Sequence, residues 1–148
     1  MKKMQFKMMT KNDLDQIARL YVEAFNGAPW YDQWTMETAK KRLGQMLGCE
    51  ESLGILAYHN HQVIGLALGN KEYYYDAVHF HLKEVCVDPT IKGQGIGSKL
   101  MEELVKRVKL EGVSEVFLWT LRCNEMQSFY EKQNFKVADE LMIMKRKI

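Results

Sequence analysis

Three glycines at alternate positions constrain this chain more than any other feature of its sequence. They stand in the stretch Lys92-Gly93-Gln94-Gly95-Ile96-Gly97-Ser98, between an apolar segment that ends at Val87 and a helical pattern that ends at Gly112. Such glycines let the backbone turn tightly and aim successive N–H groups at one point, and a helix dipole adds positive potential there. The stretch therefore predicts an anion site suited to a phosphate or pyrophosphate, to which Ser98 adds a hydroxyl and Lys92 a charge.

Two other kinds of phosphate loop fit this stretch less well. A Walker A loop closes on Gly-Lys-Ser or Gly-Lys-Thr, which is absent here. A dinucleotide loop is nearly present as Gly93-x-Gly95-x-x-Ser98, but five residues separate Gly93 from the preceding strand, and no acid ends the strand expected at 116–120. The remaining alternative is a glycine-rich turn that holds no ligand.

Apolar spacing along the chain predicts an α/β fold, a mixed sheet with helices on both faces, in one domain over residues 1–148. Thr10 and Thr35 are expected to cap the first two helices, with Asp13 completing a capping box at Thr10. Strand, loop, helix and strand over 79–120 form one right-handed parallel crossover. The expected strands are 4–10, 55–58, 63–68, 79–87 and 116–120, with one or two closing strands within 135–145; the expected helices are 14–25, 36–47, 97–112 and 125–133.

Two motifs carry a resemblance to a known family. Lys92-x-x-Gly95-x-Gly97, after a Val-x-Val-Asp-Pro strand end, resembles the acyl-CoA signature of the GNAT superfamily of N-acetyltransferases, which usually opens with Arg or Gln. The stretch from Asn124 to Phe135 is similar to a second element of that family, with Asn134 in place of a glycine; asparagine tolerates the left-handed conformation of a helix C-cap. The resemblance implies a mostly antiparallel sheet with a central parallel pair that splays at the CoA site. It also implies an enzyme that transfers an acetyl group from acetyl-CoA to a primary amine, by direct attack in a ternary complex.

Acetyl transfer needs a base for the protonated amine, a donor for the developing oxyanion and a proton for the departing thiolate. The resemblance points to Glu84 as the base, and its apolar sequence neighbours favour a raised carboxyl pKa; the alternative is that Glu84 pairs with Lys83 or faces solvent. Tyr130 is the expected proton donor, or else a core residue, and a backbone N–H of Cys86 or Val87 is the expected oxyanion donor. Asn124 is expected to bond the pantetheine amides, to cap its helix, or both. The full expected CoA-binding set is Val85, Cys86, Val87, Lys92, Gly93, Gln94, Gly95, Ile96, Gly97, Ser98, Asn124 and Phe129.

The acceptor is expected between two segments dense in aromatics and acids, residues 28–34 and 72–76. Aromatic rings hold a cation over their faces and carboxylates pair with ammonium, so the segments favour a cationic amine. The alternative is that these rings only seal the loops onto the core. The expected acceptor-binding residues are Trp30, Tyr31, Asp32, Tyr73, Tyr75 and Asp76.

Composition narrows the remaining classes of function. A net charge of +2, from 21 basic and 19 acidic residues, gives no reason to expect nucleic acid as a partner. Three scattered cysteines fit a reducing compartment, and no segment is long and apolar enough to cross a bilayer, so we expect a cytoplasmic protein with no membrane partner. His59-x-His61 and His79-x-His81 lack further ligands at metal spacing, so no metal is expected. The family that this chain resembles frequently forms homodimers, which makes a homodimer the expectation that the resemblance supplies. Two alternative functions stay open: a non-catalytic acyl-CoA-binding regulator and a protein N-terminal acetyltransferase.

Overall fold

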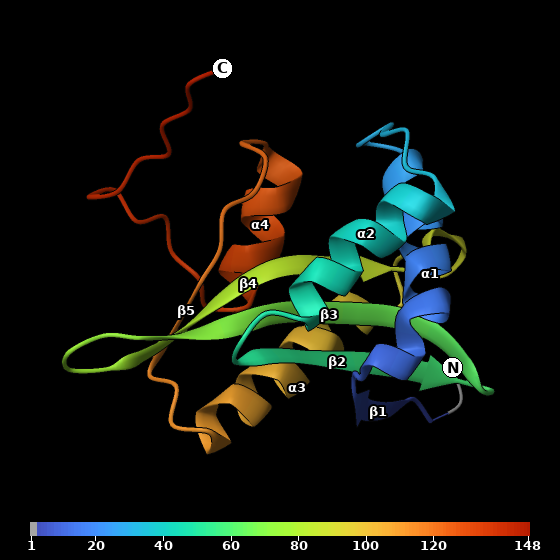
Figure 1. The fold of residues 1–148 in the computed structure, drawn as a ribbon, viewed down its shortest axis with the longest axis horizontal. Helices are drawn as coiled ribbons and strands as arrows, with labels where there is room; N and C mark the ends of the chain where they lie inside the picture. The colour runs from blue at the N-terminus through green and yellow to red at the C-terminus, as the bar shows by residue number, and fades with distance from the viewer. Residues whose placement is uncertain (1–2) are drawn as a thin grey trace.

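The computed structural model describes residues 3–148. One five-stranded sheet forms its centre, with the strands side by side in the order β1-β2-β3-β4-β5 (Figure 1). The pairs β1–β2, β2–β3 and β3–β4 are antiparallel, whereas β4 and β5 are parallel. The strands are β1 (Gln5–Met8), β2 (Ser52–His59), β3 (Gln62–Tyr73), β4 (Val78–Val87) and β5 (Glu115–Phe117).

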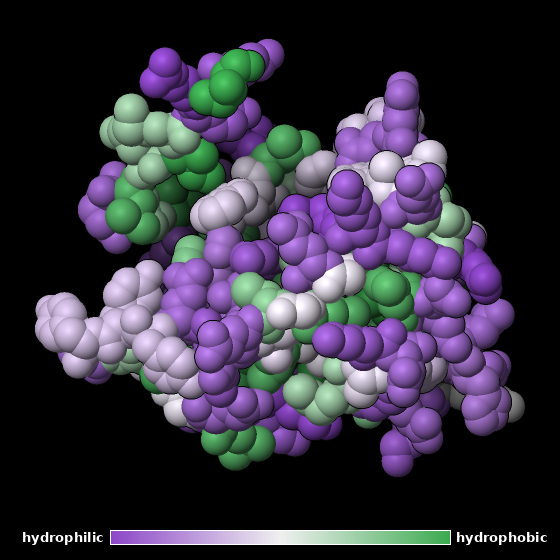
Figure 2. Space-filling model, viewed as in Figure 1, coloured by the Kyte–Doolittle hydropathy of each residue, from purple (hydrophilic) through white to green (hydrophobic). Residues whose placement is uncertain are grey.

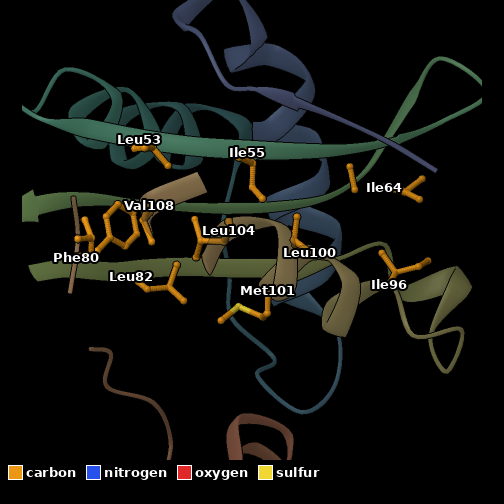
Figure 3. Packing of buried hydrophobic residues seen from close by; sticks show 13 residues of the cluster. Leu53, Ile55, Ile64, Phe80, Leu82, Ile96, Leu100, Met101, Leu104 and Val108 are labelled. Atoms are coloured by element: carbon orange, nitrogen blue, oxygen red, sulfur yellow. The ribbon is translucent and has the colours of Figure 1, made fainter. Parts of the chain in front are cut away.

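Helices cover both faces of this sheet, as the sequence predicts. Helices α1 (Leu14–Asn26) and α2 (Met36–Leu47) pack on one face over Leu56, Leu66 and Leu68. Helix α3 (Ile96–Leu110) packs on the other face, where α4 (Asn124–Lys132) joins it at the edge (Figure 1). Figure 3 shows the α3 side, where leucines and Met101 of the helix lie against side chains of β2, β3 and β4. Two short 3-10 helices, Lys11–Asp13 and Pro89–Ile91, precede α1 and the glycine loop.

Both threonines act as N-caps, although Thr10 caps the 3-10 helix Lys11–Asp13 that leads into α1, and Asp13 occupies the N-cap position of α1 itself. Thr10 and Asp13 form the expected capping box, and Thr35 forms one with Thr38 at the start of α2. After α4, Asn134 has a φ of 68°, so it takes the left-handed conformation that its place in the motif requires.

A bulge between β3 and β4 decides which face Glu84 occupies. Leu68 pairs with Glu84 but Gly69 pairs with Leu82, so Lys83 is the extra residue on β4. An extra residue reverses the alternation of side chains beyond it. Consequently Leu82 faces α3, whereas Glu84, two residues later, faces α1 and α2. A Cβ on Gly69 would collide with the carbonyl oxygen of His81, so glycine is needed beside the bulge.

The parallel pair of strands separates after three residues. Pairing between β4 and β5 runs from His79 with Glu115 to His81 with Phe117 and stops there. Beyond that point β4 continues to Val87 without a neighbour on this side in the described part of the chain. The expected splayed pair is confirmed, and β5 is shorter than the 116–120 predicted from apolar residues alone.

The prediction of one or two closing strands within 135–145 is wrong. Residues 136–148 form neither helix nor strand and are exposed throughout. They run away from the sheet beyond α4 (Figure 1). An apolar stretch becomes a strand only where another strand edge takes up its backbone hydrogen bonds, and none lies beside this segment in residues 3–148.

No helix within residues 3–148 combines the length and the apolar character that crossing a bilayer requires.

Candidate functional site

The glycine loop leads into α3 with its backbone open to solvent. Gly93 and Gly95 have φ values of 81° and 75°, in the left-handed region that favours glycine, and a Cβ on either would meet no atom within 4 Å. Gly95 is the N-cap of α3 and makes no side-chain cap bond. The first intrahelical bond runs from Lys99 N to Gly95 O, so the N–H groups before it belong to the unpaired first turn. A helix N-terminus with unpaired N–H groups carries positive potential, which favours an anion.

The side chains around the loop are engaged elsewhere. Lys92 Nζ donates to Ala28 O at 3.4 Å, toward the connection between α1 and α2. Ile96 is 3% exposed and lies in the core beneath the loop. Ser98 Oγ accepts a hydrogen bond from Gln133 Nε2 at 2.8 Å, which ties the start of α3 to the end of α4. Main-chain groups are therefore the donors that this loop offers.

Helix α4 approaches the loop at Gly97. A Cβ on Gly97 would lie 3.2 Å from a ring carbon of Phe129 and 3.8 Å from Cγ2 of Val87. The start of α3, the end of β4 and the middle of α4 therefore meet at this point. Gly97, Val87 and Phe129, which lie in contact there, are all predicted CoA-binding residues.

Tyr130 follows Phe129 into the interior of this junction. Its ring lies 4.9 Å from that of Phe129 and 5.7 Å from that of Phe135, both edge-on. Burial, together with the negative charge of Glu84, raises the pKa of Tyr130 to about 12. No side-chain hydrogen bond among the described residues involves its hydroxyl, which at neutral pH carries a proton.

Glu84 is a buried carboxylate that accepts hydrogen bonds from Arg42. Arg42 of α2 places Nη2 at 2.9 Å and Nε at 3.2 Å from the same oxygen, Oε1, which leaves Oε2 out of this contact. Burial raises the pKa of Glu84; Arg42 and the nearby phenol of Tyr21 oppose this rise, and the charge of Asp32 adds to it. The net shift is upward, as expected from its neighbours in sequence. The alternatives of a pair with Lys83 or a solvent-facing side chain do not hold.

Arg42 is the polar group that the sequence analysis missed. Its own pKa is raised through Glu84, although partial burial opposes the rise. The sequence carries a weak signal for the position of Arg42. This residue follows Ala39 by three positions and precedes Met46 by four, and both Ala39 and Met46 are buried. That spacing places Arg42 beside the buried stripe of α2.

Of the other predicted CoA-binding residues, two pack against the core and two are exposed. Val85 is partly buried against the α3 core, whereas Cys86 is buried on the α1 and α2 side, where burial raises the pKa of its thiol. Gln94 and Asn124 are exposed. Asn124 is the first residue of α4 and Cys123 occupies the N-cap position, so Asn124 does not cap the helix.

The structure does not bring the two expected acceptor segments together. Trp30, Tyr31 and Asp32 lie in the connection after α1; Trp30 packs 5.4 Å from Phe25, and Asp32 accepts from Trp34 Nε1 at 3.0 Å. Tyr73, Tyr75 and Asp76 lie at the turn between β3 and β4, the far tip of the sheet in Figure 1. Six residues of strand separate Val78 from Glu84, a span of roughly 20 Å. Only the first segment is close enough for its charge to affect Glu84.

A concavity of about 390 Å³ lies between α2 and β4, beside the Arg42–Glu84 pair. His81 is on its wall, where burial lowers the pKa of the imidazole, and the rings of Phe117 and Trp119 pack against it at 4.4 and 4.3 Å. Its lining is Arg42, Gln45, Met46, Cys49, His81, Leu82, Lys83 and Trp119. Among residues 3–148 no three His, Cys, Asp or Glu side chains gather as a metal site would require.

Known proteins resemble this chain over nearly its whole length. An uncharacterized N-acetyltransferase of Archaeoglobus fulgidus is 24% identical over 137 residues, covering 90% of this chain and 93% of that protein. The crystal structure of a possible acetyltransferase from Clostridium difficile 630 has a TM-score of 0.83 at 17% identity and covers 98% of each chain. The aminoglycoside N-acetyltransferase AAC(6')-Iy, solved in complex with CoA, has a TM-score of 0.76 at 16% identity and covers 99% of this chain and 96% of its own. At these identities the solved structures establish the fold.

The family model described as "Acetyltransferase (GNAT) family" matches residues 14–135, from the start of α1 to the end of the second motif. Its match takes in the glycine loop, Glu84 and Tyr130. The chain therefore belongs to the GNAT family of acetyltransferases.

Proposed function

We propose that this protein transfers the acetyl group of acetyl-CoA to a primary amine of a small molecule or peptide, by direct attack within a ternary complex. One observation carries the proposal: the open N-terminus of α3 lies beside the split between β4 and β5, with the buried Glu84 and the partly buried Tyr130 next to the same split. A phosphate site, an opening between strands and two proton-transfer groups in one place are what this reaction needs.

In this proposal the pyrophosphate of CoA binds the backbone N–H groups of residues 93–98. The residues fit such a group, because the loop is open in front of Gly93 and Gly95 and the helix dipole favours negative charge there. The pantetheine and acetyl groups would then run toward the unpaired stretch of β4. A backbone N–H of Cys86 or Val87 on this stretch is the proposed donor to the carbonyl oxygen as negative charge develops on it.

Glu84 is the proposed base for the acceptor amine. An amine is protonated near neutral pH, and its nitrogen attacks only after that proton has left. The raised pKa of Glu84 brings this carboxylate closer to the pKa best suited for proton transfer at neutral pH. Because Arg42 holds Oε1 alone, Oε2 remains to accept the proton, directly or through a water molecule.

The proposed acceptor is a cationic amine that binds near the connection after α1. Asp32 supplies negative charge and Trp30 an aromatic face in that connection, and Glu84 adds a second carboxylate. The acetyltransferase AAC(6')-Iy of similar fold is named as an aminoglycoside N-acetyltransferase. Tyr73, Tyr75 and Asp76 are too far along β4 to join this acceptor site within one copy of the chain.

The reaction is tested by following CoA release with a thiol reagent across a panel of acceptors. We expect turnover with aminoglycosides or polyamines, and slower or no turnover with anionic acceptors, because Asp32 and Glu84 repel them. Peptide acceptors alone would point to a protein N-terminal acetyltransferase. If the protein binds CoA but neither acetylates any amine of the panel nor hydrolyses acetyl-CoA on its own, the non-catalytic regulator is the correct function.

Tyr130→Phe is expected to slow acetyl transfer about 10-fold or more, since one general acid contributes at least that much. The affinity for CoA should stay within about 2-fold, because the phenylalanine ring keeps the packing against Phe129 and Phe135. Steady-state rates and calorimetry on the same preparation separate the two effects. An unchanged rate would remove Tyr130 from the mechanism and leave it a core residue.

A further inference from the structure

The concavity between α2 and β4 carries positive charge on its wall. Arg42 lines it from α2 and Lys83 from β4, and its lining includes no carboxylate among the residues that the structure describes. Its volume of about 390 Å³ suits a small molecule or one end of it. Figure 2 shows largely hydrophilic surface between α2 and β4, which Figure 1 labels in the same view. The charge and the size of this concavity favour an anionic group.

Lys83 is the extra residue that the bulge inserts into β4, opposite Leu68 and Gly69. Bulges re-aim side chains and occur often beside active sites. The Lys83 side chain is exposed on the wall of the concavity. The ion pairs formed among residues 3–148 do not include it. Its ammonium group is therefore available to a ligand.

Arg42 supplies the second positive charge. Its Nε and Nη2 both donate to Oε1 of Glu84, which leaves Nη1 outside this contact. The Arg42 side chain is 42% exposed. A guanidinium has five N–H donors in a planar fork that matches a carboxylate, so one arginine can serve two carboxylates. Arg42 can thus bind a ligand in the concavity while it holds Glu84.

His81 and Trp119 add a polar ring and an apolar face to the same wall. The His81 side chain is 8% exposed, and its Nδ1 lies 3.8 Å from the nearest carboxylate oxygen, on Glu72. The ring of Trp119 lies 4.3 Å from that of His81 and is 61% exposed. An aliphatic chain can lie on this exposed indole on its way to the two cations.

The positive concavity adjoins the negative charges of the acceptor site. Glu84 lies three residues from His81 along β4, which at about 3.3 Å per residue is at most roughly 10 Å. We infer that the acceptor carries a carboxylate as well as its amine, and that Arg42 and Lys83 bind this carboxylate while the amine faces Glu84. This inference rests on the proposed function. Such an acceptor has no net charge, so Asp32 and Glu84 do not repel it as they repel an anionic one.

Matched acceptors test the carboxylate. We would compare γ-aminobutyrate, δ-aminovalerate and ε-aminocaproate, each paired with its own amide, which keeps the length and removes the charge. At the best length the acid should be acetylated with a kcat/KM at least about 10-fold above that of its amide, because hydrogen bonds between charged groups are the stronger ones. Equal values for acid and amide at every length would overturn the inference.

Lys83→Glu tests the residue. Reversing this charge should remove the preference for the acid through its KM, and it should leave kcat for the amides unchanged, because Lys83 takes no part in the proton transfers. Lys109→Glu makes the same change in the last turn of α3, away from the concavity, and should keep the preference. An undiminished preference in Lys83→Glu would show that the carboxylate binds elsewhere.

Binding separates this inference from the proposed function. If no amine is acetylated, the proposed function fails, and calorimetry with ε-aminocaproate and its amide then decides the carboxylate site alone. Tighter binding of the acid that Lys83→Glu removes would support the site, and equal binding of acid and amide would overturn it. If polyamines are acetylated while acid and amide behave alike, the inference fails and the proposed function stands.

Discussion

Replacing Gly95 by aspartate is expected to weaken CoA binding at least about 100-fold. Gly95 precedes the first turn of α3, and a side chain there would project into the open space in front of the loop. A carboxylate in that space competes for the same N–H groups and repels the pyrophosphate. At short range two like charges near a protein surface interact by several kcal/mol, which is enough for such a loss. Calorimetric titration of the folded variant with CoA measures it.

Two control variants separate charge from backbone strain. Gly95→Asn has nearly the shape of Gly95→Asp without the charge, and asparagine tolerates the φ of 75° better than most residues. It should lose far less affinity. Gly112→Asp puts the same side chain at a φ of 86° after α3, away from the loop, and should leave the affinity unchanged. Equal affinity in Gly95→Asp and the unmodified protein would show that the pyrophosphate binds elsewhere.

Local sequence signals predict the glycine loop and the caps of the first helices well. The glycines, both threonine caps and Asn134 act over three or four residues, and the structure has each of them in the expected conformation. These features are decided by backbone sterics and by capping hydrogen bonds, which depend on near neighbours. They can therefore be read without knowledge of the tertiary structure.

The details of the site depend on contacts between distant elements and are harder to predict. The pair between Arg42 and Glu84 joins residues 42 positions apart, and it forms because a bulge at Lys83 turns Glu84 toward α2. A one-residue bulge leaves no plain mark in the sequence. The segments at 28–34 and 72–76 have similar composition but lie at different ends of β4, which composition cannot reveal.

The segment at 136–148 shows a third limit. Its apolar pattern predicts a strand, but a strand needs a neighbour, and a pattern does not say whether the neighbour belongs to the same chain.

Glu84→Gln is expected to lower kcat/KM about 100-fold or more near neutral pH, the usual contribution of a positioned base. Glutamine keeps the size of the side chain and an oxygen for Arg42, but it cannot take the proton of the acceptor. In the unmodified protein the rate should fall as the pH drops through the pKa of Glu84, because protonation removes the base. Since that pKa is raised, this fall begins at a higher pH than for an ordinary glutamate.

The variant should lack that acidic limb and regain activity as the pH rises toward the pKa of the amine, since the acceptor then arrives without its proton. Profiles of kcat/KM between pH 4 and pH 10 display both features. Glu103→Gln is the matched control: it removes the charge from another glutamate–arginine pair, with Arg107 at 2.8 Å along α3, and should leave the profile unchanged. A Glu84→Gln profile parallel to that of the unmodified protein would mean that another group, or water, takes the proton, and Glu84 would then serve to hold Arg42 beside the acceptor.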